Sequence, residues 1–502
     1  MKNATKLISL VLAVLMMAVA LVSCADTGNG DTTTAGAVTT NPSSANSDVV
    51  PTVPDGVTYP GQTINVIASN YDWFNDEIYV EAETGSAIPD AIWKRNDLVK
   101  TKLGIEFVYS GQDSSSGPGG TNKVVGEIDK QYEGGLNDYS VAVGNSYTMA
   151  TNTMENHFVD LTDMGAYFDL EKAYWSQGMN DALSIGNAQY LATGPMVLSS
   201  YRLIYGTLFN ETMFNNHEVE LPYDKVDSKE WTVAYQRSIV ETFCDAEVDQ
   251  DPAATYGFIV NHNNIGCDPY LSALKVPLVV KDENNMFKVE TDRDRTVSAI
   301  GEVCDLIYNT RGTYRLASYG NDSEQGDLAK KFSEGTAAMA HLRLMELEGE
   351  FISQMEDVYG ILPMPLLNSD QDNYYTMAHD QISVVGVPNT RKSESELEMI
   401  GAFLDLMAYY SYTEVTPVYY DMCLKGRYFE NPRALDMLDK LTEGLYMDPA
   451  VIYHEILGGP LGSWRGWIGS NKTSVASSIT ILGRNMTAHV KKVNTAFEKI
   501  AK

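Results

Sequence analysis

The chain has 502 residues, which is long enough for two or three domains. It carries 36 basic and 67 acidic residues, a net charge of −31, which argues against nucleic acid as a partner because such a chain repels phosphate backbones. The acidic excess is typical of a secreted protein with a solvated surface, and no cation-binding role follows from it.

A charged and then apolar segment begins the chain. Lys2 and Lys6 precede residues 7–22, an apolar run too short to span a bilayer comfortably, so residues 1–23 are predicted to be an export signal. The sequence LVSC at residues 21–24 resembles the lipobox of bacterial lipoproteins. That resemblance implies that Cys24 becomes the lipidated first residue of the mature chain. A plain signal peptide with an incidental cysteine is the alternative.

The next segment, residues 24–58, is rich in Thr, Ser, Asn, Gly and Pro. It has almost no large apolar side chain, so burial cannot offset the entropy lost on ordering it. We expect a disordered tether between the membrane and a folded body.

The folded body is predicted to open with a βαβ unit. Residues 63–69 are predicted to be a strand, residues 89–103 a helix closed by Gly104, and residues 105–109 a second strand. Such a unit implies a parallel sheet, and ligands of parallel sheets collect beyond the carboxyl ends of the strands.

That rule selects residues that follow the predicted strands. After the first strand come Tyr71, Asp72 and Trp73, whose aromatic faces and carboxylate suit a polyhydroxylated ligand, although Trp73 packed on its own lobe is an equal alternative. After a strand at residues 139–143 come Asn145 and Tyr147. Both are candidate ligand contacts, and the alternative for Asn145 is a local Asx-turn.

Two features in the middle of the chain bear on metals and disulfides. The acidic loop 245–251 alternates carboxylates as a calcium loop does, but it lacks the turning glycine and the bidentate glutamate. A solvated turn without a metal is therefore predicted, and bound calcium is the alternative. Cys244, Cys267, Cys304 and Cys423 contain no C-x-x-C pair. Three disulfide pairings are possible, and buried free thiols are the preferred interpretation.

Residues 322–365 predict alternating helices and strands. A helix over residues 322–332 is followed by Gly335, a residue type that closes helices. Residues 336–342 are predicted to be a buried strand, residues 343–355 a helix, and residues 359–362 another strand. This succession is the unit of an α/β sheet.

The same stretch resembles the C-terminal half of the extracellular solute-binding proteins of bacterial ABC importers, in the carbohydrate-type class (family 1-like) that contains oligosaccharide binders. The family's F-x-x-G-x-x-A-M junction and G-x-x-P-x-P strand end are matched here by Phe332, Gly335, Ala338, Met339, Gly360, Pro363 and Pro365. The resemblance covers residues 60–502 in the order of elements.

The resemblance implies an α/β fold of the two-lobe, periplasmic-binding-protein-like type II class, with parallel-rich sheets and a hinge of crossing segments. It places lobe 1 at residues 59–196 plus 379–412 and lobe 2 at residues 197–378 plus 413–502. Crossings are expected within residues 190–210, 373–388 and 409–420. Because a crossing strand lines the cleft floor, Tyr201 and Arg202 become candidate ligand contacts.

The C-terminal part is predicted to be mainly helical. Ser393 and Glu396 form a capping box, Asn431-Pro432 starts a further helix, and apolar residues at spacings of three or four predict a long amphipathic helix from 475 to 497 that packs on lobe 2. Residues 458–469, GGPLGSWRGWIG, are predicted to be a loop. Trp464 and Trp467 are candidates to stack on a ligand with Arg465 as a donor, and their burial beneath the lobe is the alternative.

The sequence offers no catalytic motif of the H-E-x-x-H, G-x-S-x-G or P-loop type. His341 and His379 are interpreted as hydrogen-bonded structural residues. The prediction is a monomeric, non-enzymatic receptor without a cofactor, lipid-anchored to the outer face of the cell membrane, that delivers a sugar or oligosaccharide to ABC permease subunits.

Other functions and ligands stay open. A secreted glycoside hydrolase is one alternative, because paired carboxylates in an aromatic cleft serve both functions. A ligand-sensing or adhesive lipoprotein without an importer is the other, and peptides and polyols remain possible ligands.

Overall fold

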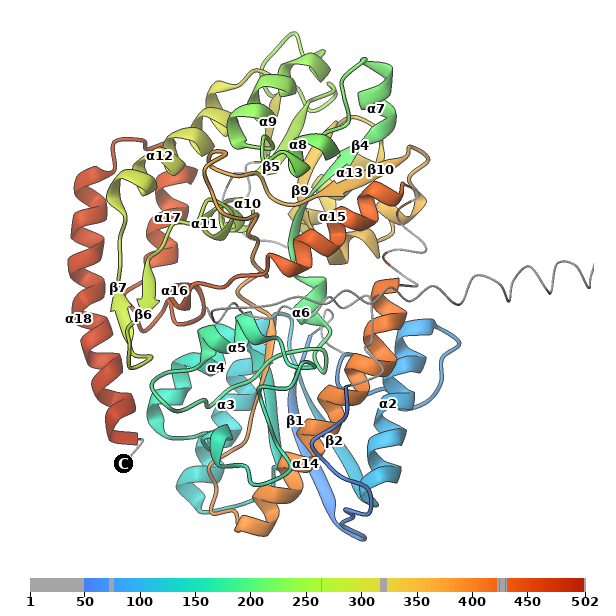
Figure 1. The fold of residues 1–502 in the computed structure, drawn as a ribbon, viewed down its shortest axis with the longest axis vertical. Coiled ribbons are helices and arrows are strands. Elements are labelled where there is room, and N and C mark those ends of the chain that lie inside the picture. Colours follow the sequence, from blue (N-terminus) through green and yellow to red (C-terminus); the bar gives the residue numbers. More distant parts are fainter. Residues whose placement is uncertain are drawn as a thin grey trace, which may run out of the picture. The chain divides into compact units, whose positions relative to one another are not determined.

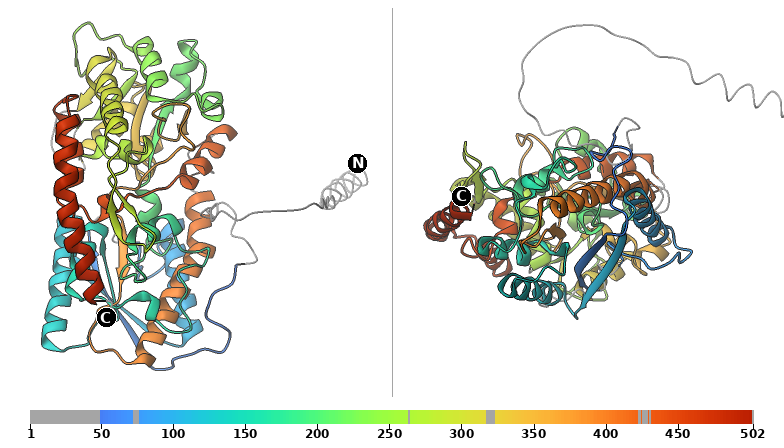
Figure 2. Two further views of the ribbon diagram at one scale, coloured as in Figure 1. Left: turned by 60° about the vertical axis from the view of Figure 1, so that its left-hand side comes forward. Right: turned by 90° about the horizontal axis from the view of Figure 1, so that it is seen from below.

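The computed structural model describes residues 49–71, 76–262, 264–316, 323–421, 424, 429 and 431–500. The predicted export signal, Cys24, Asp72, Trp73 and Cys423 lie outside the described residues. Figures 1 and 2 show two β-sheets, each with helices packed against it. Both sheets belong to one unit of the chain.

A four-stranded sheet forms the core of the first lobe. Its strands are β1 (Thr63–Asn70), β2 (Glu106–Asp113), β3 (Val141–Asn145) and β11 (Ser383–Gly386), in the order β11-β3-β1-β2. β1 is parallel to β2 and β3, and β11 is antiparallel to β3. The predicted βαβ unit is confirmed, because α2 (Ala87–Leu103) joins β1 to β2 and ends at Gly104, whose φ of 66° suits glycine.

A five-stranded mixed sheet forms the core of the second lobe. Its strands are β4 (Tyr205–Asn210), β5 (Phe258–Asn261), β8 (Thr313–Leu316), β9 (Met339–Arg343) and β10 (Tyr359–Leu362), in the order β10-β4-β9-β5-β8. β5 is parallel to β8 and β9, whereas β4 is antiparallel to β9 and β10. Both strands predicted between residues 336 and 362 are therefore present, and Gly335 ends α13 (Ser323–Ser333) with a φ of 69°.

Among the described elements, the chain passes between the lobes three times. It leaves the first sheet after β3 and enters the second at β4, returns from β10 to β11, and leaves α14 (Glu394–Tyr410) for α15 (Pro432–Glu443) (Figure 1). The first two passes run side by side, because His379 N–H donates to the carbonyl of Leu203 at 2.9 Å. These crossings confirm the predicted two-lobe architecture.

The C-terminal region contains α16 (Pro449–Ile452), α17 (Pro460–Gly469) and α18 (Ala476–Ile500). The apolar stripe of α18 is buried as predicted, at Ile479, Leu482, Met486, Val490, Val493 and Phe497. The end of α18 also reaches the first lobe, because the ring of Phe497 lies 5.6 Å from that of Tyr190. The prediction that this helix packs on the second lobe is thus incomplete.

The remaining helices and one hairpin complete the described fold. The helices are α3 (Gly117–Gly134), α4 (Ser146–Asn152), α5 (Gln177–Leu183), α6 (Ser199–Arg202), α7 (Glu211–Asn216), α8 (Tyr223–Asp227), α9 (Val233–Val240), α10 (Asn264–Cys267), α11 (Pro269–Ala273) and α12 (Arg293–Cys304). A hairpin of β6 (Val279–Lys281) and β7 (Phe287–Val289) forms a separate two-stranded sheet. A π-helical turn, Ser411–Val415, extends α14.

Three sequence-based predictions are wrong. Residues 343–355 form two 3-10 turns, Leu344–Leu347 and Ile352–Gln354, with Gly349 between them, and not one helix. Residues 458–469 contain the helix α17, because Pro460 occupies its first position and Gly459 precedes it with a φ of 71°.

The third wrong prediction concerns the tether, whose last residues, 49–58, belong to the folded body. Val53 is 2% exposed, and the backbone N–H of Thr52 donates to the Asp405 carboxylate at 2.8 Å. A buried carboxylate on α14 thus binds a segment whose composition predicts disorder.

Candidate functional site

Arg465 joins two buried carboxylates at the junction of the lobes. Its Nε donates to Oδ1 of Asp268 at 2.7 Å, and its Nη2 donates to Oδ2 of Asp268 and, at 2.9 Å, to Oδ2 of Asp380. Asp268 precedes α11 in the second lobe, and Asp380 lies on the returning crossing next to β11. The side chains of Asp268 and Asp380 are 0% and 5% exposed, whereas that of Arg465 is 20% exposed.

Residues from the first lobe complete this cluster. The hydroxyl of Ser146, at the start of α4, donates to the carbonyl of Asp380 at 2.5 Å. The next side chain, Tyr147, places its ring 5.2 Å from the His454 ring, which follows α16 in the C-terminal region. Burial and the negative charge of Asp380 raise the pKa of Tyr147 to about 12, so its phenol is a neutral donor at ordinary pH.

The buried groups carry a net negative charge. Burial raises the pKa of Asp268 above its ordinary value, while His379 and Arg465 outweigh burial and lower that of Asp380. Burial also lowers the pKa of His379 to about 4 and lowers that of His454, so both imidazoles are neutral near pH 7. Two carboxylates therefore face one guanidinium.

Tyr205 lies beside the same charges. Its side chain is 1% exposed, its ring centroid is 6.3 Å from that of His379, and Asp268, Asp380, Arg343 and Arg465 all influence the pKa of its phenol. Its hydroxyl has no hydrogen-bond partner within the part of the chain that the structure describes. A buried phenol without a partner is costly, and it provides a polar group that a bound molecule can satisfy.

The predicted residues Tyr201 and Arg202 form a second group on α6. Nε and Nη2 of Arg202 donate to both carboxylate oxygens of Glu348 at 3.0 and 2.9 Å, and its guanidinium lies 5.9 Å from the centre of the Tyr419 ring. Burial opposes the charge of Arg202, but Glu348 outweighs it and raises the pKa of the guanidinium. Arg202 thus links the first crossing to the turn after β9.

The structure separates the ten ligand-contact candidates that sequence reasoning selected. It brings Tyr147 and Arg465 together and places Asn145, 1% exposed, shortly before Tyr147 in the sequence as the cap of α4, where its Oδ1 accepts from Thr148 N–H at 3.1 Å. Tyr71 is half-buried against the core, whereas Asp72 and Trp73 lie outside the described residues.

Trp464 and Trp467 are 1% and 8% exposed, as their alternative interpretation has it. Trp464 donates its indole N–H to the carbonyl of Cys267 at 2.8 Å. With its indole nitrogen and most of its surface occupied, Trp464 has a packing role.

Sequence reasoning missed Asp268, Asp380 and His454. Asp380 lies in the crossing predicted at residues 373–388, so the rule that selected Tyr201 and Arg202 also applied to it. Asp268 and His454 lie far from Arg465 and Tyr147 in the sequence, and only the packing of α17 and α16 brings them close.

Comparisons with known proteins place the fold. No family model matches the chain, and no curated protein matches it. Among solved structures, an ABC substrate-binding protein from Listeria monocytogenes in complex with cycloalternan matches with a TM-score of 0.52 at 13% identity, covering 85% of this chain and 98% of that one.

Two further structures agree with this match. The GacH receptor of Streptomyces glaucescens, solved unliganded and with acarbose, has a TM-score of 0.51 at 14% identity, with 85% and 99% coverage. A sugar transporter from Rhizobium etli in an open conformation has a TM-score of 0.52 at 14% identity, with the same coverage. The chain has the fold of ABC solute-binding proteins.

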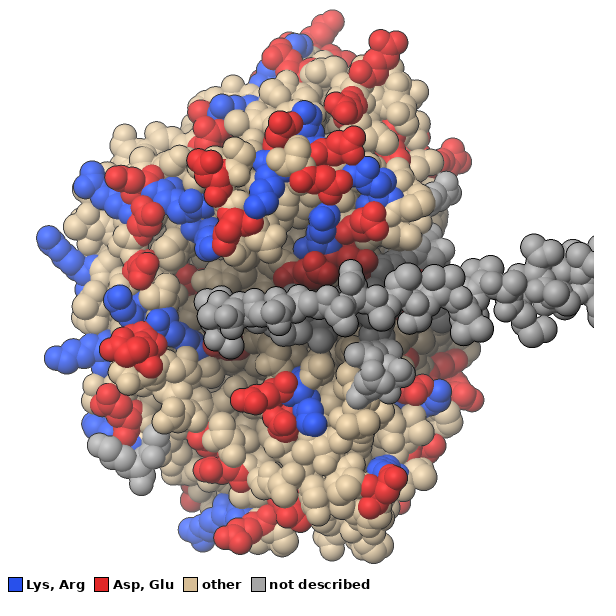
Figure 3. Space-filling view, in the orientation of Figure 1, with Lys and Arg blue, Asp and Glu red and all other residues tan. Residues whose placement is uncertain are grey.

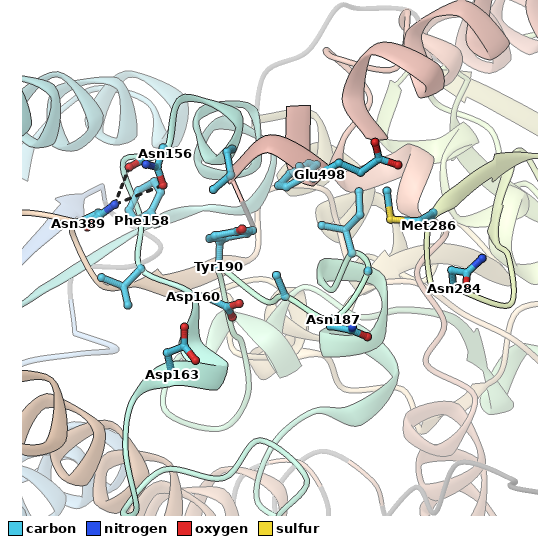
Figure 4. A pocket seen from close by; sticks show the side chains of 16 residues that line it. Asn156, Phe158, Asp160, Asp163, Asn187, Tyr190, Asn284, Met286, Asn389 and Glu498 are labelled. Carbon is cyan, nitrogen blue, oxygen red and sulfur yellow. Dashed lines mark hydrogen bonds between the residues drawn. The ribbon is translucent and has the colours of Figure 1, made fainter. Parts of the chain in front are cut away.

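The described structure also contains a cavity that Arg465 does not line. It measures about 930 Å³ and lies between the first lobe and the end of α18. Figure 4 shows residues that line it, among them Asn156, Phe158, Asp160, Asp163, Tyr190, Met286 and Glu498. Asn389 donates to the Asn156 carbonyl at 3.1 Å at its edge. It contains none of the predicted ligand contacts, so we do not assign the solute site to it.

The structure also describes the acidic loop, three of the cysteines and His341. In the acidic loop, Asp245 accepts from Thr255 N–H and Asp249 from Arg315, and no group of three or more metal-ligand side chains occurs among the described residues. Cys244, Cys267 and Cys304 are free, and the first of them is only half-buried. His341 is buried, with a pKa lowered to about 3 by burial.

Figure 3 shows acidic and basic side chains interspersed over one face of the molecule. Within the described ranges, no helix is both long and apolar enough to cross a membrane.

Proposed function

We propose that this chain is a receptor that captures a solute, a sugar or oligosaccharide, between its lobes and delivers it to an ABC permease. The observation that carries the proposal is the Arg465 cluster, to which both lobes and a crossing contribute polar side chains. Ligand contacts made by both lobes exist only when the lobes are closed, and that difference is what shifts the equilibrium toward closure.

The structural neighbours support the ligand class. One of them, a substrate-binding protein, was solved in complex with cycloalternan, and another, a receptor, was solved in complex with acarbose. We infer that residues 59–196 plus 379–412 and residues 197–378 plus 413–502 move as the two lobes. The predicted lipid on Cys24 would hold the receptor at the outer face of the cell membrane.

Small-angle scattering with and without maltotriose, cycloalternan and a peptide and polyol panel tests capture. We expect the radius of gyration to fall with the ligand that binds and the saccharide to be recovered intact. Released reducing ends without compaction would instead support a glycoside hydrolase. If the protein bound a saccharide but no permease subunit came down with it from the producing cells, the alternative of a ligand-sensing lipoprotein without an importer would be supported.

Mass spectrometry of the mature N-terminus tests the anchor separately. A diacylglycerol on Cys24 is expected, and a Cys24→Ala variant should be released into the medium. An unmodified N-terminus at another residue would contradict the lipoprotein assignment and leave the solute-binding proposal intact.

A further inference from the structure

The guanidinium of Arg465 is fixed by two carboxylates that come from different parts of the fold. Asp268 holds Nε and Nη2 from the second lobe, and Asp380 holds Nη2 from the crossing. These hydrogen bonds use Nε and Nη2, and Nη1 has none to a described residue. The two N–H groups of Nη1 therefore remain for another acceptor. An arginine held in this way presents donors in a fixed direction.

The charges around this arginine do not make an anion site. Arg465 is outnumbered by Asp268 and Asp380, and the second nearby guanidinium, that of Arg343, is paired with Glu346 at 2.7 Å. Glu455 adds another carboxylate close to Tyr147 and His454. Because these groups are largely buried, salt screens their repulsion of an anion only weakly.

We propose that the Asp268–Arg465–Asp380 triad makes this receptor select neutral, hydroxyl-bearing saccharides against their carboxylate-bearing counterparts. A hydroxyl can accept from Nη1 of Arg465 and donate to a carboxylate, whereas a uronate can only accept and adds a negative charge. The hydroxyl of Tyr205 has no hydrogen-bond partner among the described residues and is buried near the triad, so in this proposal it donates to, or accepts from, the same neutral ligand. The inference rests on the proposed function.

Matched ligand pairs test the selection. We would measure Kd by calorimetry for glucose with glucuronate, galactose with galacturonate, and cellobiose with cellobiouronate. Wild-type protein should bind the neutral member at least tenfold more tightly in each pair that binds. Equal or tighter binding of a uronate would overturn the inference and leave solute capture standing, whereas failure of every saccharide, including those of the scattering panel, would overturn the proposed function itself.

Two variants separate charge from geometry. Asp380→Asn keeps the shape of the side chain and removes one negative charge, so the neutral-to-uronate ratio should fall about tenfold. Arg465→Lys keeps the charge and loses the bidentate geometry, so both ligands should bind more weakly with the ratio unchanged.

Asp224→Asn is the matched control, because this exposed carboxylate pairs with Arg433 away from the triad and its loss should leave the ratio as it is in the wild type. An Asp380→Asn ratio equal to the wild-type ratio would contradict the role of the triad. If Asp380→Asn does not fold, as judged by circular dichroism, the wild-type ratios decide the question alone.

Discussion

Arg95 ties the first lobe to the connecting segments. Its Nη1 donates to the carbonyls of Glu77 and Met196 at 3.2 and 3.1 Å and to the hydroxyl of Ser411 at 3.1 Å. The Glu77 carboxylate in turn accepts from Ser199 N–H at 2.9 Å and from the Ser383 hydroxyl. These two side chains thus contact all three crossings, and both are buried.

Replacing Arg95 by Met should be strongly destabilising. The change leaves the buried carbonyls of Glu77, Ile78 and Met196 without this donor, so we expect a loss of about 3–5 kcal/mol in the free energy of unfolding. Urea unfolding measures it. Arg311→Met is the control, since Arg311 is 60% exposed and its pair with Glu241 should contribute no more than about 1 kcal/mol.

A loss for Arg95→Met as small as that of the control would mean that the crossings are not held through this side chain.

The buried carboxyl of Asp448 should make the stability of the protein depend on pH. It is 1% exposed and accepts from the N–H groups of Leu278 and Ala450 at 2.8 and 2.7 Å, but burial dominates and raises its pKa from 3.8 to about 6. The folded state therefore binds this proton more tightly than the unfolded state does. The contribution is fully present below about pH 4 and is lost as the pH rises through about 6.

Asp448→Asn should remove that dependence. The free energy of unfolding of the wild type minus that of the variant should fall by about 3 kcal/mol between pH 4 and pH 7, because a shift of about two units corresponds to that difference. Unfolding curves in urea at four pH values measure it. If the free energy of unfolding of the two proteins varied with pH in parallel, the pKa of Asp448 would not be raised in the folded state.

At the scale of elements, local sequence patterns predicted the helix starts correctly where tertiary packing favours the same structure. The capping box is present, because Glu396 N–H donates to the Ser393 hydroxyl and Ser393 N–H to the Glu396 carboxylate, and Asn431-Pro432 starts α15. The missed helix α17 shows the opposite error, since its three glycines outweighed the signal of Pro460 at its first position. Burial of both tryptophans stabilises a helix of weak intrinsic propensity.

The candidate site was only partly predictable for a related reason. Strand ends indicated Tyr147 as a candidate, because the edge of a parallel sheet follows from local periodicity, and its contact with a ligand stays a prediction. The contact of Arg465 with Asp268 and Asp380 joins segments 197 and 85 residues apart, and no local rule encodes such a contact.

The β6–β7 hairpin fastens the second lobe to the first. Asn285 Nδ2 donates to the Gly186 carbonyl at 2.8 Å, and the Gly186 N–H donates back to the Asn285 carbonyl at 2.9 Å. Lys281 donates to the Ser184 hydroxyl at 2.6 Å. In the proposed closure of the lobes, the hairpin has to release or follow residues 184–186.

Asn285→Gly tests this attachment. Glycine adopts the φ of 58° at this position without strain, so the variant removes only the side-chain bonds. We expect amide hydrogen exchange at Gly186 to become roughly fivefold faster, as loss of about 1 kcal/mol of local stability implies. Asn284→Gly in the same turn is the control and should leave that amide unchanged, and equal effects of both variants would argue against a specific attachment.

At the scale of the whole molecule, the fold depends on segments that lie far apart in sequence. Three crossings, the hairpin and the end of α18 connect the two lobes, and the described chain starts by packing on α14. Tyr174 OH donates to Oδ1 of Asp405, whose other oxygen accepts from Thr52 and Val53 N–H. The start of the described chain is therefore part of the core of the first lobe.

Two truncations test where the folded body begins. A protein starting at residue 49 should match the full mature chain in its free energy of unfolding, whereas one starting at residue 59 should lose about 2–4 kcal/mol, because Val53 no longer fills its buried site and Asp405 loses two donors. Urea unfolding followed by fluorescence measures both. Asp405→Asn in each background separates the contributions, since it should cost less in the shorter protein, where the carboxylate has already lost its backbone partners. Identical stability of the two truncations would return residues 49–58 to the tether.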